Sequence, residues 1–286
     1  MPTRAFRVAY DGRPFYGFQR QPDVPTVEDT LFDALRRLDV LADDADKPVG
    51  YAAAGRTDAG VSAVAQTVAF ECPDWATPRA LNSELPGTVR AWAAADVADD
   101  FHATHDAVAR RYTYHLYAPE SGVDALDGRG GVDDDRARAA LDALCGEHDF
   151  HNLTLDDTGT VRELSGGLTR DGDFLVVRVE AGGFARELVR RVVSLVHGVA
   201  SGDAALAKVE RVLGSNPLDG AEGIPSAPAT PLVLTGVDYP DAAFTVDGMA
   251  AASTRRAFGE AAVAGRVAGR VAGEVRAGVP AAHGDE

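Results

Sequence analysis

The chain has 286 residues, of which 45% are hydrophobic and 25% are charged, and this composition excludes a disordered or fibrous protein. No run of about 18 apolar residues occurs, and the N-terminus lacks the apolar segment of a signal peptide, so we predict a cytoplasmic protein without a membrane span. With 28 basic and 44 acidic residues, the net charge of −16 argues against a nucleic-acid partner unless the basic residues cluster.

The first half of the chain is predicted to alternate strands with a helix. In residues 4–10, Phe6, Val8 and Tyr10 fall on one side, as in a strand, and a loop rich in glycine and proline follows. Thr26 is a candidate N-cap for a helix in which leucines recur at helical spacing. Further strands are expected over 49–55, 62–70 and 110–117.

The second half is predicted to repeat this order of elements. We expect a helix over 133–145 that ends at Gly146, a strand over 173–181, helices over 187–199 and 203–213, and a last strand over 231–240. The pattern favours an α/β or α+β architecture with two similar lobes that share a sheet, residues 1–105 and 106–241. Residues 242–286 are rich in Ala, Gly and Arg and form either an appended helix or a loosely ordered tail.

Two features of composition bear on habitat and chemistry. Lys47 and Lys208 are the only lysines, and strong acidity keeps a protein soluble in very high salt, where self-repulsion is screened. We therefore predict a halophilic protein; the alternative is a merely acidic protein from a GC-rich genome. The cysteines, Cys72 and Cys145, cannot form a disulfide framework or a four-ligand zinc site, and no P-loop motif occurs.

The motif that most suggests catalysis is AAGRTDAGVSA, residues 53–63. Gly55 and Gly60 allow positive φ and a close approach of a ligand to the backbone. Between them, Asp58 lies beside Arg56, and a carboxylate on a tight loop next to a guanidinium is a plausible nucleophile. The alternative is an aspartate that only accepts hydrogen bonds from turn amides. His102 with His105 and His148 with His151 are spaced like metal ligands, but nothing in the sequence completes a site.

The string AGRTDAGV, residues 54–61, resembles the active-site signature of the tRNA pseudouridine synthase A family. Six further segments resemble the family in the same order, namely YDGRPFYGFQRQ (10–21), ALNSELP (80–86), DDFHATHDAVARRYTYHLY (99–117), GEHDFHNL (146–153), GGFARELVRRVV (182–193) and PLVLTGVDYPD (231–241). The chain departs from the family at Ser62, where many members have His, and in RRVVSLV, which lacks a glycine that several members carry.

The resemblance implies an α+β fold of two similar α/β lobes that share a central antiparallel sheet, with flanking helices and a cleft between the lobes. It implies isomerisation of uridine to pseudouridine in the anticodon stem-loop of tRNA, at positions 38, 39 and 40. Asp58 is then the catalytic carboxylate, assisted by Arg56 and Arg190, of which Arg190 pairs with it. The isomerisation changes no redox state and transfers no phosphate, so no cofactor and no metal are required.

The resemblance also implies the residues that hold the RNA. Tyr112 is expected to stack on the target base and to serve the proton step, although the residues alone favour plain sheet packing. Arginines are expected to contact phosphates, and the first loop to reach the RNA; these residues are Arg110, Arg111, Arg186, Arg191, Gln19 and Arg20. We expect a localised positive groove on a negative surface.

The resemblance further implies a homodimer whose tRNA spans both subunits. A catalytically inactive tRNA-binding relative is the alternative function. An unrelated hydrolase with an aspartate nucleophile is disfavoured by the matching Tyr and Arg segments.

Overall fold

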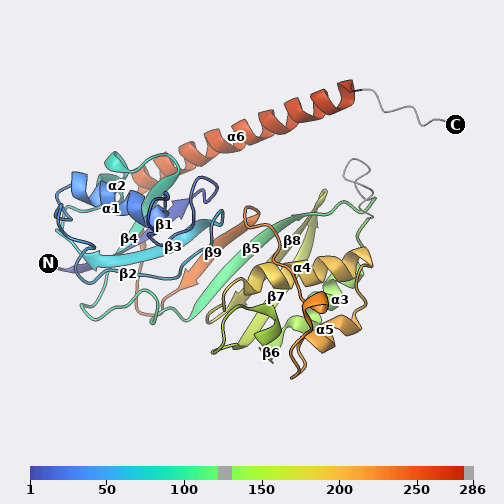
Figure 1. The fold of residues 1–286 in the computed structure, drawn as a ribbon. Helices are drawn as coiled ribbons and strands as arrows, with labels where there is room; N and C mark the ends of the chain where they lie inside the picture. The colour runs from blue at the N-terminus through green and yellow to red at the C-terminus, as the bar shows by residue number, and fades with distance from the viewer. Residues whose placement is uncertain (122–130, 280–286) are drawn as a thin grey trace.

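The computed structural model describes residues 1–121 and 131–279. In this part of the chain, ten strands form one sheet in the order β10-β4-β1-β3-β9-β5-β8-β7-β6, and the short β2 pairs with β3 (Figure 1). The strands are β1 (Thr3–Tyr10), β2 (Ala52–Ala53), β3 (Ser62–Glu71), β4 (Val89–Asp96), β5 (Ala109–Tyr117), β6 (Gly146–Asp149), β7 (Val161–Asp171), β8 (Phe174–Ala181), β9 (Leu232–Asp238) and β10 (Thr245–Val246).

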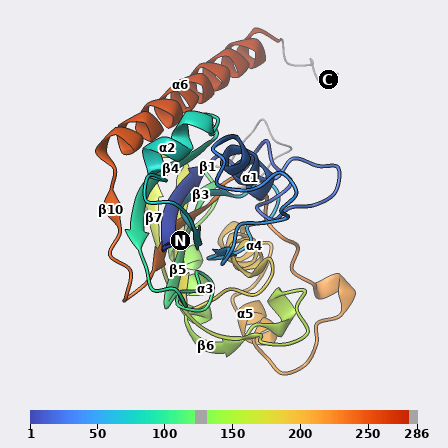
Figure 2. The same ribbon diagram turned by 90° about the vertical axis from the view of Figure 1, so that its left-hand side faces the viewer.

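The helices interrupt the strands along the chain. They are α1 (Val27–Arg37), α2 (Pro78–Glu84), α3 (Asp134–Leu144), α4 (Leu188–Ser201), α5 (Ala207–Val212) and α6 (Gly248–Gly278), with two short 3₁₀ helices at His151–Leu153 and Gly220–Glu222. Figure 2 shows α1 and α4 on the same side of the sheet. Among the described residues, no helix is both long enough and apolar enough to cross a bilayer.

The sheet is mixed, which corrects the expectation of an antiparallel sheet. β3 and β9 run parallel, in register at Ser62 with Val233 and Ala63 with Leu234, whereas the other strand pairs are antiparallel. The parallel pair lies where strands from the two halves of the chain meet. Since Ser62 directly follows the Asp58 loop, this junction fixes that loop at the centre of the sheet.

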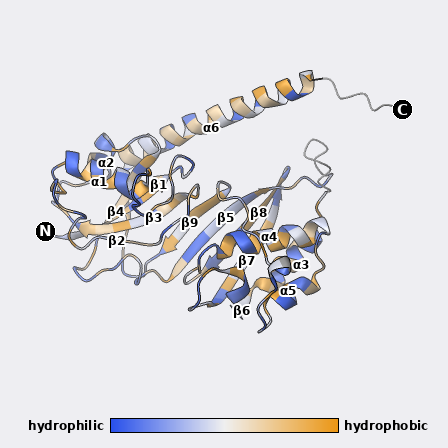
Figure 3. Ribbon diagram, viewed as in Figure 1, coloured by the Kyte–Doolittle hydropathy of each residue, from blue (hydrophilic) through white to orange (hydrophobic). Residues whose placement is uncertain are grey.

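Two large hydrophobic clusters support the two ends of the sheet. One packs α1 onto β1 and β3, and its members include Phe6, Tyr10 and Leu35. The other surrounds α4, whose apolar positions all point inward as the helical spacing predicts; Leu188, Val192, Leu195 and Val196 are buried. Figure 3 shows that hydrophobic and hydrophilic residues alternate along both α1 and α4, as in helices with one buried face.

Several predicted elements are confirmed and two are shorter than expected. Thr26 is the N-cap of α1 and accepts a hydrogen bond from the Asp29 amide at 3.2 Å. The strand predicted over 49–55 is reduced to β2, because Gly50 has a φ of +67° and turns the chain. The helix predicted over 203–213 is only α5, because Gly202, at φ +88°, ends α4 and the chain turns before Ala207.

The end of the chain forms a helix, so of the two alternatives for residues 242–286 the appended helix is confirmed over Gly248–Gly278. It starts at the N-cap Asp247 and packs against β4 and α2 by Ala250, Ala251 and Thr254. Its second half is exposed and projects from the body of the molecule (Figure 1). Residues 280–286 lie outside the described part of the chain.

Candidate active site

A cleft of about 1070 Å³ lies between α1 and the N-terminus of α4. Its wall from the first half consists of the Asp58 loop, the end of the first loop and α1, while the wall from the second half consists of residues 184–190. Tyr112 of β5 also lines it. The cleft therefore collects, in one space, side chains that are more than a hundred residues apart in the sequence.

The Asp58 loop is anchored on its buried side by hydrogen bonds between uncharged groups. The hydroxyls of Thr57 and Tyr10 share a hydrogen bond of 2.7 Å, and the Gln66 amide donates to the Gly55 carbonyl at 2.9 Å. From the loop that follows β1, the Phe18 amide donates to the Thr57 carbonyl at 3.0 Å. Thr57, Tyr10 and Gln66 are all buried, and burial raises the pKa of Tyr10, so its phenol stays neutral. These bonds fix the backbone directly before Asp58, whose side chain lines the cleft.

Glycines allow the loops to pack this closely. Gly60 has a φ of +81°, as predicted, whereas Gly55 does not have positive φ and has open space around it, which corrects that expectation. The closest approach is instead made by Gly12, where a Cβ would lie 2.1 Å from the Val61 carbonyl oxygen. Ser62, at the position of the family's histidine, accepts a hydrogen bond from the Gly12 amide at 3.0 Å.

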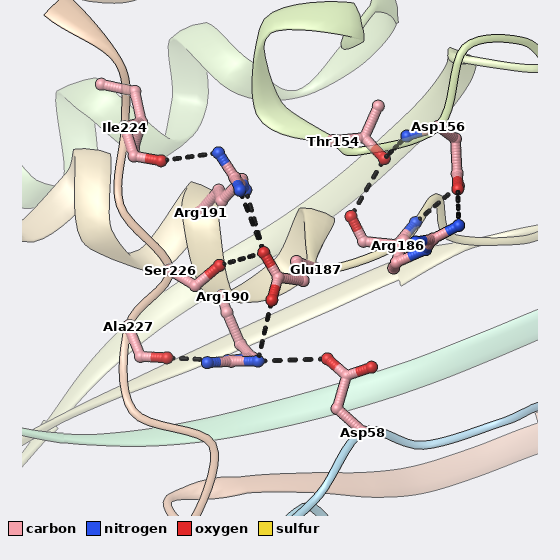
Figure 4. A network of polar contacts seen from close by, with 10 residues as sticks. All are labelled: Asp58, Thr154, Asp156, Arg186, Glu187, Arg190, Arg191, Ile224, Ser226 and Ala227. Atoms are coloured by element: carbon pink, nitrogen blue, oxygen red, sulfur yellow. Dashed lines mark hydrogen bonds and ion pairs between the residues drawn. The ribbon is translucent and has the colours of Figure 1, made fainter. Parts of the chain in front are cut away.

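Arg190 meets Asp58 across the cleft. Its Nη1 lies 3.2 Å from Oδ2 of Asp58, and its Nε donates to the Ala227 carbonyl at 2.7 Å (Figure 4). The Arg190 side chain is 16% exposed and that of Asp58 36%. The guanidinium is thus fixed within the wall, while the carboxylate is open to an incoming ligand and has a cation to stabilise its charge.

A second carboxylate, that of Glu187, holds the same arginine from behind. One of its oxygens lies 3.5 Å from Nη1 of Arg190, and the other accepts hydrogen bonds from Arg191 at 3.0 Å and from the Ser226 hydroxyl at 2.6 Å. The hydrogen bond from Ser226, followed by the two arginines, lowers the pKa of Glu187. Arg191 also donates to the Ile224 carbonyl, so it is engaged within the protein.

Tyr112 presents its ring to the cleft beside a second aromatic residue. The rings of Tyr112 and Phe184 lie edge to face, 5.1 Å apart at 89°. Burial raises the pKa of Tyr112 to about 12, the charge of Asp58 adds to this, and Arg110 opposes it. The phenol is therefore neutral at physiological pH, and an aromatic face next to a carboxylate suits an unstacked base.

The cleft is not the positive groove that was predicted. Its lining holds five basic residues against six acidic ones, namely Arg20, Lys47, Arg56, Arg186 and Arg190 against Glu28, Asp29, Asp46, Asp58, Asp156 and Glu187. Several acids engage the arginines: Arg20 contacts Asp29 at 2.7 Å and Asp46 at 2.9 Å, and Arg186 contacts Asp156 at 3.3 Å. Most of the positive charge of the cleft is thus already balanced inside the protein.

Two predicted site residues are left open in the cleft: Arg56, expected to assist Asp58, and Gln19, expected to contact the RNA. Arg56 and Gln19 are exposed and line it, and neither has a hydrogen bond or ion pair within residues 1–121 and 131–279. Arg56 does not contact Asp58, so of the two arginines only Arg190 is paired with that carboxylate.

Arg110 and Arg111 lie on opposite faces of β5. Arg110 donates to the carbonyls of Ala54 at 2.9 Å and Thr104 at 2.6 Å, so it braces the approach to the Asp58 loop. Arg111 is not part of the cleft lining; it pairs with Asp238 at 2.6 Å and Glu180 at 3.3 Å. Arg110 is likewise absent from the cleft lining, although strand alternation puts it on the same face as Tyr112.

Sequence reasoning missed the residues that position the predicted ones. Thr57, Glu187, Ser226 and Phe184 received no role, although all but Ser226 lie inside the quoted motifs. The spacing of Glu187 three and four residues before Arg190 and Arg191 is a helical ion-pair signal that was available. Ser226 carried no such signal. In the described part of the chain, no three His, Cys, Asp or Glu side chains are grouped to bind a metal.

The sequence of the chain is similar to those of known enzymes. Residues 140–240 match a family model described as tRNA pseudouridine synthase. The chain is 58% identical over 255 residues to the tRNA pseudouridine synthase A of Haloarcula marismortui and 60% identical over 255 residues to that of Natronomonas pharaonis, in each case covering 89% of this chain and 92% of the relative. The enzyme of Methanosarcina mazei is 39% identical over 82% of this chain and 84% of the relative.

The more similar relatives come from halophilic archaea, in line with the acidic composition. Among solved structures, the chain is similar to the archaeal box H/ACA sRNP Nop10–Cbf5 complex, at 17% identity and a TM-score of 0.33 over 68% of this chain and 43% of that one. This structural similarity is too weak to support a family assignment. At 58–60% identity over nine-tenths of its length, the chain belongs to the tRNA pseudouridine synthase A family.

Proposed function

We propose that the chain converts uridine to pseudouridine in tRNA, with Asp58 as the catalytic carboxylate in the cleft. The activity follows from membership of the family at 58–60% identity. One observation supports the assignment of the site: the half-exposed carboxylate of Asp58 lies 3.2 Å from Arg190, within a cleft that Tyr112 also lines. The reaction is an isomerisation, since C5 releases a proton and N1 takes one up, so the composition of the nucleoside does not change.

The chemistry requires the N1–C1′ glycosidic bond to break, the uracil to turn, and C5 to join C1′. Asp58 can attack C1′ or C6 covalently, or remove a proton from C2′ to give a glycal, and the three routes remain open. Each requires an ionised carboxylate that reaches a nucleoside flipped out of its stack. The contact with Arg190 orients the carboxylate, and the partial exposure of Asp58 allows it to reach a nucleoside in the cleft.

Tyr112 is proposed as the platform for the target base. Its ring packs at 89° to that of Phe184 and lines the cleft, an arrangement that fixes the ring beside the space for the base. Because its phenol is neutral, it can donate a proton or a hydrogen bond to the turning uracil, as the proton step demands.

The RNA backbone is proposed to meet Arg56 and Gln19, which are open in the cleft. Phosphates can also compete for Arg20 and Arg186, whose acidic partners are partly exposed. The proposed target uridines are positions 38, 39 and 40 of the anticodon stem-loop, as the family resemblance implies.

Three further proposals concern the oligomeric state of the protein, its place in the cell and its division into two lobes. We propose a homodimer that acts in the cytoplasm, and light scattering in molar KCl tests the dimer, since a monomeric mass contradicts it. The division into residues 1–105 and 106–241 is supported by the two hydrophobic clusters. β9 belongs to both, because Leu232 packs in one cluster and Leu234 in the other.

The function is tested by release of tritium from tRNA that carries it at uridine C5, because C5 loses its hydrogen when it joins C1′. Wild type should release tritium, whereas Asp58→Asn and Asp58→Ala should lose at least about a thousandfold in rate. Asp135→Asn is the matched control, since its carboxylate is 95% exposed on α3 and only pairs with Arg138.

The outcomes separate the alternatives. Tritium release by wild type and Asp135→Asn alone supports the proposal. Binding of tRNA by wild type without release identifies the inactive tRNA-binding relative. Full activity of Asp58→Asn contradicts the assignment of the catalytic carboxylate.

A further inference from the structure

We propose that Glu187 is a positioning residue for this reaction, one that holds Arg190 so that only one oxygen of Asp58 is engaged. The inference rests on the proposed function and adds a residue to its site. Glu187 lines the cleft but makes no contact with Asp58 among the described residues; we propose that it acts through the arginine (Figure 4).

The backbone of Glu187 is held in an uncommon conformation. Its φ is +61° and ψ +2°, the left-handed region, which is unfavourable for a residue other than glycine. The residue is the N-cap of α4, yet its side chain caps no amide of the helix. A glycine fits this position without strain, so the contacts of the carboxylate must compensate for the backbone cost.

Those contacts divide the carboxylate between three partners. Oε1 lies 3.5 Å from Nη1 of Arg190, while Oε2 accepts from Arg191 at 3.0 Å and from Ser226 at 2.6 Å. The Glu187 side chain is 22% exposed, less than that of Asp58. Ser226 and Arg191 thus fix Glu187, and Glu187 in turn fixes the guanidinium.

The result is a one-point contact between Arg190 and Asp58. An isolated arginine and carboxylate tend to form two parallel hydrogen bonds, which occupy both carboxylate oxygens. Here Nη1 is shared between Asp58 and Glu187, and Nε is engaged by the Ala227 carbonyl. Only Oδ2 of Asp58 is bonded to the arginine, and Oδ1 has no hydrogen-bond partner among the described residues.

A free Oδ1 is what the chemistry needs. Attack on C1′ or C6, or removal of the C2′ proton, requires an unoccupied carboxylate oxygen aimed into the cleft. Without Glu187, the guanidinium can turn and close on both oxygens of Asp58. The expected defect is therefore in turnover, whereas binding of tRNA should change little.

The test separates this role from support of the helix. In Glu187→Gly the carboxylate is lost and the backbone strain is removed, so the protein should keep its melting temperature within a few degrees. We expect kcat for tritium release to fall about thirtyfold to a hundredfold, with KM changed by less than about threefold. Glu187→Gln, which keeps the shape but has no charge, should lie between Glu187→Gly and wild type.

A double-mutant cycle shows whether Glu187 acts through Arg190. Measured in single turnover, Glu187→Gly should cause no further loss once Arg190→Met is present, because the group that Glu187 positions is gone. In an Arg191→Met background, part of the loss from Glu187→Gly should remain, because Ser226 still holds the Glu187 carboxylate. Arg191 is the matched control since it contacts the same carboxylate but not Asp58.

Two results overturn the inference: kcat of Glu187→Gly within twofold of wild type, or an undiminished further loss in the Arg190→Met background. A wild-type enzyme that releases no tritium instead contradicts the proposed function. An active wild type beside an unimpaired Glu187→Gly contradicts only the role of Glu187.

Discussion

The two walls of the cleft hold their functional side chains in different ways. Asp58 stands on a loop fixed by neutral, buried hydrogen bonds through Thr57 and Gly55. Arg190 stands on a helix fixed by charged groups that are partly open to solvent. Salt screens exposed charges far more than it affects buried neutral bonds. The carboxylate of Asp58, the proposed catalytic group, is thus placed by the contacts that salt disturbs least.

The largest effect is expected from Gly12→Ala, which tests whether the wall that carries Asp58 is rigid. The new Cβ would overlap the Val61 backbone at 2.1 Å, so the Asp58 loop must move. We expect at least about a hundredfold loss of kcat in the tritium assay and about 3 kcal/mol less stability in thermal unfolding. Gly167→Ala, with nothing within 4 Å, is the control. An active Gly12→Ala enzyme contradicts the idea that this wall is rigid.

Tyr112→Phe tests what lies between the walls. The ring remains for stacking, so tRNA affinity should stay within about twofold, while turnover should fall about a hundredfold if the hydroxyl serves the proton step. Tyr114→Phe, which only loses a hydrogen bond to the Pro228 carbonyl, should retain its activity. Equal activity of Tyr112→Phe and wild type shows that the hydroxyl has no part.

The pKa of Tyr112 also gives a direction with pH. It is raised from 10 to about 12 by burial, so the neutral phenol favours the folded state below pH 10, and that contribution is lost as the pH rises from 10 through 12. The phenol should therefore cause no loss of activity between pH 6 and about 9.5.

The net charge of −16 predicts that salt stabilises the whole protein, by screening repulsion between carboxylates. The melting temperature should rise by about 5–10 °C between 0.1 and 3 M KCl, which corresponds to about 2–3 kcal/mol for a chain of this size. A flat or falling melting temperature in circular dichroism contradicts the halophilic prediction.

Thr57→Val isolates a single neutral bond. It removes the partner of the Tyr10 hydroxyl and should cost about 1–2 kcal/mol in chemical unfolding. The cost should be the same at 0.5 and 3 M KCl, whereas the smaller cost of Asp156→Asn, which breaks a partly exposed pair with Arg186, should shrink with salt. A strong salt dependence for Thr57→Val contradicts the contrast between the walls.

The smallest effect is expected outside both walls. Arg111→Gln breaks exposed pairs with Asp238 and Glu180 and should change stability by less than about 1 kcal/mol. Since Arg111 lies off the cleft, tRNA affinity should stay within twofold in a filter-binding assay. A tenfold loss instead supports the sequence-based prediction that Arg111 contacts phosphate.

The sequence predicts features that depend on local spacing and fails where the fold brings distant residues together. The inward face of α4 and the N-cap Thr26 follow from periodicity and capping preference within a dozen residues. The length of β2 does not, because within residues 49–55 only Ala52 and Ala53 pair with β3 as a strand, and the chain turns at Gly50 before them. The parallel pairing of β3 with β9 joins segments about 170 residues apart, and no local pattern encodes it.

The site shows the same limit. The family motif singles out Asp58, Tyr112 and Arg190, but not the hydroxyl of Ser226, which reaches Glu187 from 39 residues away. Clustering of positive charge was predicted from the arginines that lie in the matched segments, whereas the structure pairs Arg20 and Arg186 with acids from other segments. The opposite faces of Arg110 and Arg111 could have been predicted from strand alternation alone.

The outer half of α6 also has a consequence for the dynamics of the molecule. From Gly259 on, its side chains are almost all exposed, and Gly265, Gly269 and Gly273 each weaken a helix by about 1 kcal/mol relative to alanine. With no core to hold it, this part depends on its own backbone bonds and can unwind and rewind while the sheet stays intact. It is where the polypeptide should first become open to a protease, long before the cleft loses its shape.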